Sequence, residues 1–146
     1  MTSAPIIFVL NGPNLNLLGT REPEIYGHQT LDDIATRLED QARPLGLTID
    51  MRQSNHEGHL IDWLHEANSV GAKAVLLNAG GYTHTSIAIH DAIKSIKVPV
   101  IEVHLSDPHQ REAFRHLSYI GMAAVACFAG HGAASYTLAL DAAAKL

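Results

Sequence analysis

The stretch IIFVLNGP, residues 6–13, decides how the chain folds. It opens with an unbroken apolar run rich in β-branched side chains, and the run stops at Asn11-Gly12-Pro13, a typical turn sequence. An apolar run without alternating polar residues predicts a strand buried on both faces, as in a parallel sheet that helices cover on both sides. The rest of the chain is therefore expected to supply further parallel strands and the helices that connect them.

Strand-like and helical segments alternate from this stretch to the end of the chain. We expect strands over residues 6–10, 47–51, 74–77, 98–104 and 123–129. We expect helices over residues 31–42, from a cap at Ser54 to Gly71, over 86–96, over 111–116 and in the alanine-rich tail. Thr30 is placed to cap the first helix, and Ser54 with Glu57 has capping-box spacing.

Short connections through helices force neighbouring strands to pair in parallel and place helices on both faces of the sheet. The sequence therefore predicts a single domain over residues 1–146. Its expected fold is α/β, a flavodoxin-like doubly wound sandwich with a five-stranded parallel sheet in the order 2-1-3-4-5.

Composition narrows the possible functions of the 146-residue chain. A net charge of −5 argues against a nucleic-acid partner, which needs clustered lysine and arginine. No apolar run approaches the roughly 20 residues that span a bilayer, and the first residues lack the regions of a signal peptide. With one cysteine, Cys127, the chain can form no internal disulfide and no cysteine-based zinc site. We therefore expect a cytoplasmic protein with no membrane partner.

Polar residues follow three of the expected strands where each strand ends. A loop over residues 11–27 follows the first strand, and Asn78 to Ser86 leads from the third strand into a helix. The fourth strand ends with Glu102 and His104, which a period of two places on the same face. Ligands of open parallel sheets bind beyond the carboxyl ends of the strands, so these residues are expected to form the functional site. The first loop is long enough to serve as a lid.

Sequence motifs for common ligands are missing or incomplete. The chain has no glycine-rich nucleotide loop, and His56-Glu57-Gly58-His59 is one residue short of a zinc-binding spacing. A receiver domain would need an aspartate at Asn78, and a flavin domain would need a Ser/Thr-rich loop after the first strand. Such a non-catalytic module is one alternative. Another is a different lyase or isomerase that forms an enolate from a polyhydroxylated acid.

Four motifs follow one another along the chain at the expected strand ends. They are NGPNLNLLG at 11–19 with REP at 21–23 and YG at 26–27, QSNHEG at 53–58, NAGGYTHTS at 78–86, and EVHLS at 102–106. Together they closely resemble type II 3-dehydroquinate dehydratase, and the resemblance covers essentially the whole chain. Two positions depart from the family's pattern: Ser135 stands where a glycine is expected, and His59 stands where an acidic residue is common.

The resemblance implies a lyase that dehydrates 3-dehydroquinate to 3-dehydroshikimate without cofactor or metal, in the shikimate pathway of aromatic biosynthesis or in quinate catabolism. By motif, Tyr26 would remove the C2 proton, and His104 would protonate the departing C1 hydroxyl. Tyrosine needs a nearby cation to act as a base at neutral pH, and Arg21 in the same loop could supply it. Asn14 would stabilise the enolate through a bound water, and Glu102 would orient His104.

The same motifs imply which residues bind the substrate. They are Asn78, His84, Asp91, Arg115 and the backbone of Leu105 and Ser106. Asn78 and the two backbone groups would hold the carboxylate, and the other three the ring hydroxyls, with Arg111 supporting the site. Closure of the loop would shield the enolate from water. Family members form dodecamers built from trimers, and the resemblance implies the same homo-oligomer here.

Overall fold

The computed structural model describes residues 4–20, 22–26 and 28–146, with Tyr26 described by its backbone alone. A five-stranded parallel sheet runs through the centre in the order β2-β1-β3-β4-β5, which confirms the expected topology. The strands are β1 (Ile6–Asn11), β2 (Thr48–Gln53), β3 (Ala74–Asn78), β4 (Val100–Val103) and β5 (Ala126–Phe128).

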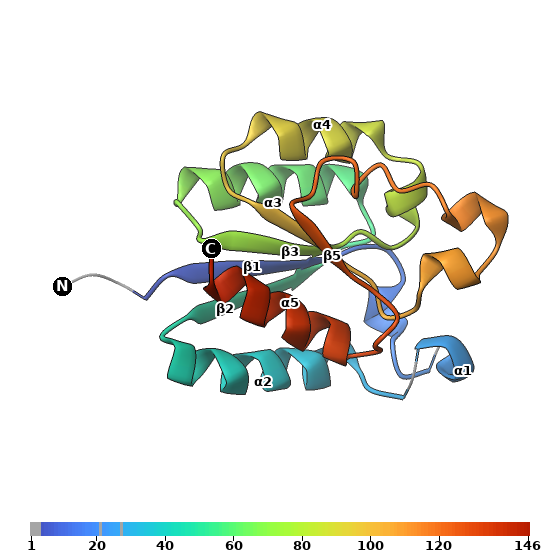
Figure 1. Cartoon of the computed structure of the whole chain (residues 1–146), viewed down its shortest axis with the longest axis horizontal. Coiled ribbons are helices and arrows are strands. Elements are labelled where there is room, and N and C mark those ends of the chain that lie inside the picture. The colour runs from blue at the N-terminus through green and yellow to red at the C-terminus, as the bar shows by residue number, and fades with distance from the viewer. Residues whose placement is uncertain (1–3, 21, 27) are drawn as a thin grey trace.

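Four helices cover the sheet, two on each face (Figure 1). Helices α2 (Leu31–Ala42) and α5 (Ala134–Ala144) lie on one face, and α3 (Glu57–Ser69) and α4 (Ile87–Ser95) on the other. The short α1 (Pro23–Tyr26) lies at the end of the molecule where the strands finish. Short 3₁₀ helices span Leu15–Leu17, Arg43–Leu45, Gly80–His84, Pro108–Gln110 and Ala113–Arg115. No helix within the described residues is long and apolar enough to cross a membrane.

Strand β1 is buried on both faces, as the unbroken apolar run predicts. Ile7 and Val9 pack into the core beneath α2 and α5, whereas Phe8 and Leu10 pack into the core beneath α3 and α4. Alternate side chains of a strand point to opposite faces, so one strand contributes to both cores. The pairing of β1 with β2 on one side and β3 on the other holds its position in the sheet.

The predicted cap at Thr30 is confirmed, but the predicted capping box at Ser54 is wrong. The Ser54 hydroxyl accepts a hydrogen bond from the His56 N–H at 3.0 Å, which forms a turn before the helix rather than its first turn. Helix α3 begins at Glu57, whose carboxylate accepts a hydrogen bond from the Ser86 hydroxyl beside α4. Capping-box spacing therefore marked the turn correctly but misplaced the start of the helix.

Residues 111–116 do not form the predicted helix. The segment instead contains one short 3₁₀ helix, Ala113–Arg115, and a separate one, Pro108–Gln110, precedes it and is capped by Asp107, whose carboxylate accepts the N–H of His109 at 3.0 Å. Strand β5 is also shorter than predicted, since it pairs only with β4 at the edge of the sheet. Both differences lie where the chain lacks the two-sided burial that makes β1 and β3 regular.

The backbones of β1 and β3 come unusually close just beyond the strands. The Gly12 N–H donates to the Asn78 carbonyl at 2.8 Å, and a Cβ on Gly12 would lie 2.3 Å from the Ala79 carbonyl oxygen. No side chain fits at that distance, so this turn requires glycine. The close approach places the ends of β1 and β3 side by side at the point where the strand order reverses.

We expect Gly12→Ala to lower the free energy of unfolding by about 3 kcal/mol, because the added methyl must displace backbone rather than a flexible side chain. Gly58→Ala is the matched control, since a Cβ there meets nothing within 4 Å. The control should raise stability by up to about 1 kcal/mol, as alanine does in a helix. Urea titration at one protein concentration measures both, and equal stability of the two variants would contradict the prediction.

Candidate active site

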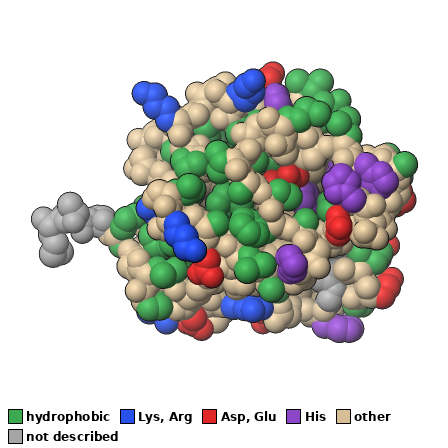
Figure 2. Space-filling view, in the orientation of Figure 1, with side chains coloured by type: hydrophobic (Ala, Val, Ile, Leu, Met, Phe, Trp, Pro, Cys, Tyr) green, Lys and Arg blue, Asp and Glu red, His purple; other side chains and the backbone are tan. Residues whose placement is uncertain are grey.

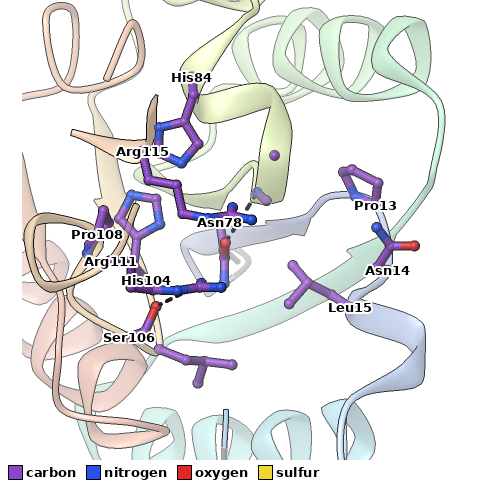
Figure 3. Close-up of a pocket in the computed structure, with 13 residues that line it drawn as sticks. Pro13, Asn14, Leu15, Asn78, His84, His104, Ser106, Pro108, Arg111 and Arg115 are labelled. Atoms are coloured by element: carbon purple, nitrogen blue, oxygen red, sulfur yellow. Dashed lines mark hydrogen bonds between the residues drawn. The ribbon is translucent and has the colours of Figure 1, made fainter. Parts of the chain in front are cut away.

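A cavity of about 170 Å³ opens beyond the carboxyl ends of β1, β3 and β4 (Figure 3). Figure 2 shows histidine side chains gathered toward the same end of the molecule. Within the described residues, no group of three His, Cys, Asp or Glu side chains is arranged to hold a metal ion. The cavity is lined by Pro13, Asn14, Leu15, Asn78, Gly80, Gly81, His84, His104, Leu105, Ser106, Pro108, Arg111 and Arg115.

His104 and Glu102 form a buried pair at the end of β4. The His104 Nε2 lies 2.6 Å from a carboxylate oxygen of Glu102, and both side chains are less than a tenth exposed. The shared strand face predicted this contact. Because the ionised carboxylate is an acceptor, Nε2 carries the proton of this hydrogen bond, and Nδ1 is the ring nitrogen left for other partners.

Glu102 is held as a carboxylate by further donors. The Ser118 hydroxyl accepts the N–H of Gly121 at 2.8 Å and donates to the same Glu102 oxygen at 2.6 Å. Burial raises the pKa of the Glu102 carboxyl, but the hydrogen bond and charge of His104, then the hydrogen bonds from Ser118 and Cys127, outweigh it and keep the pKa below its usual range. Glu102 is therefore negatively charged at neutral pH, in direct contact with the His104 ring.

His84 enters the cavity from the 3₁₀ turn that follows β3. Its Nδ1 lies 2.8 Å from the Leu117 carbonyl, which can only accept, so Nδ1 carries a proton. Burial lowers the pKa of the imidazole, against a smaller raising effect of the Leu117 carbonyl. His84 therefore favours the neutral form, and its Nε2 is a hydrogen-bond acceptor.

The cavity wall beyond β4 carries donors for an anion. The guanidiniums of Arg111 and Arg115 both line it, and Arg111 also donates to the Ser106 hydroxyl at 3.4 Å. The carbonyls of Leu105 and Ser106 accept the N–H groups of Gly132 and Gly130, which fixes this segment. Among the described residues, the N–H groups of Leu105 and Ser106 have no acceptor. Together these groups favour binding of a carboxylate.

Asn14 lies across the cavity from His104, and Asn78 lines the cavity between them, nearer to His104 (Figure 3). Asn14 adopts the left-handed conformation, with φ of 69°, and its N–H donates to the Asn55 side chain at 3.0 Å. Asn78 ends β3, and its side-chain oxygen accepts the N–H of Gly80 at 3.3 Å. Both side chains can therefore offer amide groups to a ligand.

The structure does not bring every predicted site residue into the cavity. Asp91 is exposed on α4 and is absent from the cavity lining. Arg21 and the side chain of Tyr26 lie outside the described residues. The roles assigned to these three residues remain predictions.

Sequence reasoning missed the residues that hold the site residues in place. Ser118 and Cys127 contact Glu102, and Tyr136 of α5 contacts Asn78. The signal for Tyr136 was present, because it is the only residue with a polar aromatic side chain on the buried face of an alanine- and leucine-rich helix. Ser118 carried no signal, since it lies in an irregular segment.

The two departures from the family pattern have local structural roles outside the cavity lining. Ser135 is fully buried, and its hydroxyl accepts the N–H of His131 at 3.1 Å. The ring of His59 lies 5.9 Å from that of Trp63, and its Nδ1 lies 2.7 Å from the Ser54 hydroxyl.

Cys127 is exposed, yet we expect its thiol to be unreactive. Partial burial and the neighbouring Glu102 carboxylate raise its pKa to about 12, so the thiolate fraction at pH 8 is roughly 1,000-fold below that of an ordinary cysteine. Glu102→Gln removes the negative charge and should speed alkylation by iodoacetamide. Mass spectrometry of the labelled chain measures both rates, and a wild-type rate equal to that of free cysteine would contradict the assignment.

Comparison with known proteins agrees with this site. A family model described as dehydroquinase class II matches residues 5–144. A protein of Phenylobacterium zucineum named 3-dehydroquinate dehydratase is 59% identical over 140 residues, 96% of each chain. The type II dehydroquinase structure from Propionibacterium acnes is 42% identical, with a TM-score of 0.93 over 100% of this chain and 99% of that chain. The one from Butyrivibrio crossotus is 38% identical, with a TM-score of 0.94 over 97% and 99%. These matches span the strands, the helices and the cavity residues alike, and the chain therefore belongs to the class II dehydroquinase family.

Proposed function

We propose that the chain is a 3-dehydroquinate dehydratase of the shikimate pathway, a lyase that removes water from 3-dehydroquinate to give 3-dehydroshikimate. The observation that carries this conclusion is the buried pair of His104 and Glu102 at a cavity lined by Arg111 and Arg115, in a member of this family. We further propose that residues 1–146 form a single catalytic domain, which works in the cytoplasm without cofactor or metal.

The cavity suits a small hydroxylated carboxylic acid. In our proposal the substrate carboxylate accepts hydrogen bonds from the N–H groups of Leu105 and Ser106 and from the side chain of Asn78, which lie on adjoining walls. The neutral His84 accepts a hydrogen bond from one ring hydroxyl, and Arg115 donates to another. Charge-assisted bonds to the carboxylate give affinity, and the hydroxyl contacts fix which face of the ring meets His104.

The first step is removal of the C2 proton. The phenolate of Tyr26 takes this proton, and Arg21 favours the phenolate over the neutral phenol by its charge. The electron pair of the broken C–H bond forms an enolate with the neighbouring ketone. Asn14, through a bound water, donates to the enolate oxygen, and its position on the cavity wall supports this role.

The second step expels the C1 hydroxyl. The protonated His104 gives the Nδ1 proton to this oxygen as the C–O bond breaks, and water leaves while the enolate electrons form the new C=C bond. Glu102 stabilises the imidazolium beforehand and fixes the ring through Nε2. Solvent then returns a proton to His104 and takes one from Tyr26, so the enzyme regains its starting state.

We propose a homo-oligomer, a dodecamer built from trimers, and two observations support an assembly. Phe114, Met122 and Val125 are each at least 60% exposed, which is unusual for large apolar side chains on one segment. Asp91 is exposed on α4, one turn after the exposed Ile87. A substrate contact from Asp91 therefore requires the cavity of a neighbouring copy, packed against this face of α4.

The activity test follows the ultraviolet absorbance of the conjugated enone product, with a metal chelator present throughout. We expect turnover by the wild type, and a fall in kcat of at least about 100-fold in Tyr26→Phe with unchanged thermal unfolding. Tyr119→Phe is the matched control, because the Tyr119 hydroxyl makes no hydrogen bond to described residues. Full activity of Tyr26→Phe would show that another group is the base.

The contact of Asp91 across copies is tested by mixing two weak variants. Asp91→Ala chains retain His104, and His104→Ala chains retain Asp91, so unfolding the two together and refolding them creates cavities that contain both intact groups. We expect the mixture to be at least tenfold more active than either variant refolded alone. Ultracentrifugation checks that the refolded mixture forms assemblies of wild-type mass. If such assemblies are no more active than either variant alone, Asp91 does not act in the neighbouring site.

A further inference from the structure

A chain of buried hydrogen bonds joins four elements beneath the cavity. The Asn11 Nδ2 donates to the backbone carbonyl of Arg52 at 2.9 Å, and the Tyr136 hydroxyl donates to the Asn11 oxygen at 2.7 Å. The Asn78 Nδ2 donates to the Tyr136 oxygen at 2.9 Å. Asn11, Asn78 and Tyr136 are each at most 4% exposed, so water has little access to these bonds.

This series of hydrogen bonds ends at two backbone groups, the Arg52 carbonyl, which can only accept, and the Gly80 N–H, which can only donate. The Arg52 carbonyl can only accept, so the amide of Asn11 must turn its NH₂ toward Arg52 and its oxygen toward Tyr136. The Tyr136 hydroxyl has a single hydrogen and gives it to that oxygen, so it can only accept from Asn78. Burial raises the pKa of the phenol, which therefore stays protonated.

The orientation of the Asn78 amide follows from both sides. Tyr136 requires a donor and so faces the NH₂, whereas the Gly80 N–H requires an acceptor and so faces the oxygen, at 3.3 Å. The second hydrogen of the Asn78 NH₂ has no acceptor among the described residues, and the side chain lines the cavity. A flipped amide would present an oxygen to an incoming carboxylate and repel it.

We propose that Tyr136 is a positioning residue, which fixes the direction of the Asn78 amide so that it offers an N–H to the substrate carboxylate. The inference rests on the proposed function, in which Asn78 binds that carboxylate. It assigns a role to a side chain that is not among the residues that line the cavity. Asn11 is part of the same device, because it occupies the only hydrogen of the hydroxyl.

Two single variants have effects of different size. Tyr136→Phe removes the hydroxyl and leaves the Asn78 amide free to turn, so KM should rise severalfold. Asn11→Leu keeps the hydroxyl but removes its acceptor, so the hydroxyl donates to the Asn78 oxygen and reverses the amide. KM should then rise at least about tenfold, the cost of losing a hydrogen bond to a charged group. In both variants kcat should change less than about threefold. The contact between Asn78 and the substrate carboxylate is made equally in the bound substrate and in the transition state, so its loss affects KM rather than kcat.

The decisive variant combines the two changes. With no hydroxyl present, the loss of Asn11 cannot reverse the amide, so Asn11→Leu/Tyr136→Phe should return to the smaller KM of Tyr136→Phe alone. If the two changes were independent packing defects, their effects on KM would instead multiply in the double variant. In an Asn78→Ala background, where no amide remains to be oriented, neither change should raise KM further. Tyr119→Phe is the control for loss of a tyrosine hydroxyl elsewhere.

The outcomes separate this inference from the proposed function. An inactive wild type would overturn the proposed function and the inference with it. An Asn78→Ala variant with wild-type KM would overturn the binding role of Asn78. If Asn78→Ala raises KM but the double variant is worse than Asn11→Leu, positioning by Tyr136 is wrong. If thermal unfolding shows that Asn11→Leu does not fold, the effect of Tyr136→Phe on KM is compared in the wild type and in Asn78→Ala. An equal rise in KM in both backgrounds would overturn positioning by Tyr136.

Discussion

The close approach of β1 and β3 beyond their carboxyl ends is the constraint on which the site depends. A backbone contact that only glycine permits, between Gly12 and Asn78, holds the two strand exits together where the strand order reverses. Loops that leave the sheet on either side of this point must diverge, and the cavity lies in the space between them. The polar residues at the strand ends thereby become neighbours although they are distant in sequence.

Two kinds of electrostatic control operate within this small cavity. On the β4 side, Glu102 is a buried charge whose cost is offset by the donors His104 and Ser118. On the β1 and β3 side, Asn11, Asn78 and Tyr136 are all neutral. Here the orientation of their hydrogen-bond donors and acceptors, rather than a charge, determines what the cavity offers to a ligand. Because neutral groups orient Asn78, the cavity wall beside it needs no second carboxylate, which would repel the carboxylate of the substrate.

Much of the fold was predictable because two-sided burial leaves a clear pattern in the sequence. The apolar run at Ile6–Leu10 predicted β1, and the period of two at Glu102 and His104 predicted their contact. The helix at 111–116 and the cap at Ser54 were wrong, because local spacing describes turns as well as helices. A short apolar period cannot distinguish an α-helix from a 3₁₀ helix of three residues.

The supporting residues of the site could not be predicted, because their partners are distant in sequence. Ser118 lies 16 residues from Glu102, and Tyr136 lies 58 from Asn78 and 125 from Asn11. No spacing rule reaches across such separations, and only the folded sheet brings the groups together. The roles of Arg21, Tyr26 and Asp91 rest on the family's motifs.

Tyr136 lies in α5, which follows all five strands along the chain, and this order has a consequence for how the protein is made. The strands whose ends form the cavity all precede α5 in the chain, so they can emerge from the ribosome and pair before this helix exists. Until α5 docks, however, the amide of Asn78 has no hydroxyl to fix its direction. The cavity wall that holds Asn78 is therefore completed only when α5 is in place, so the ability to recognise substrate arises later than the pairing of the strands.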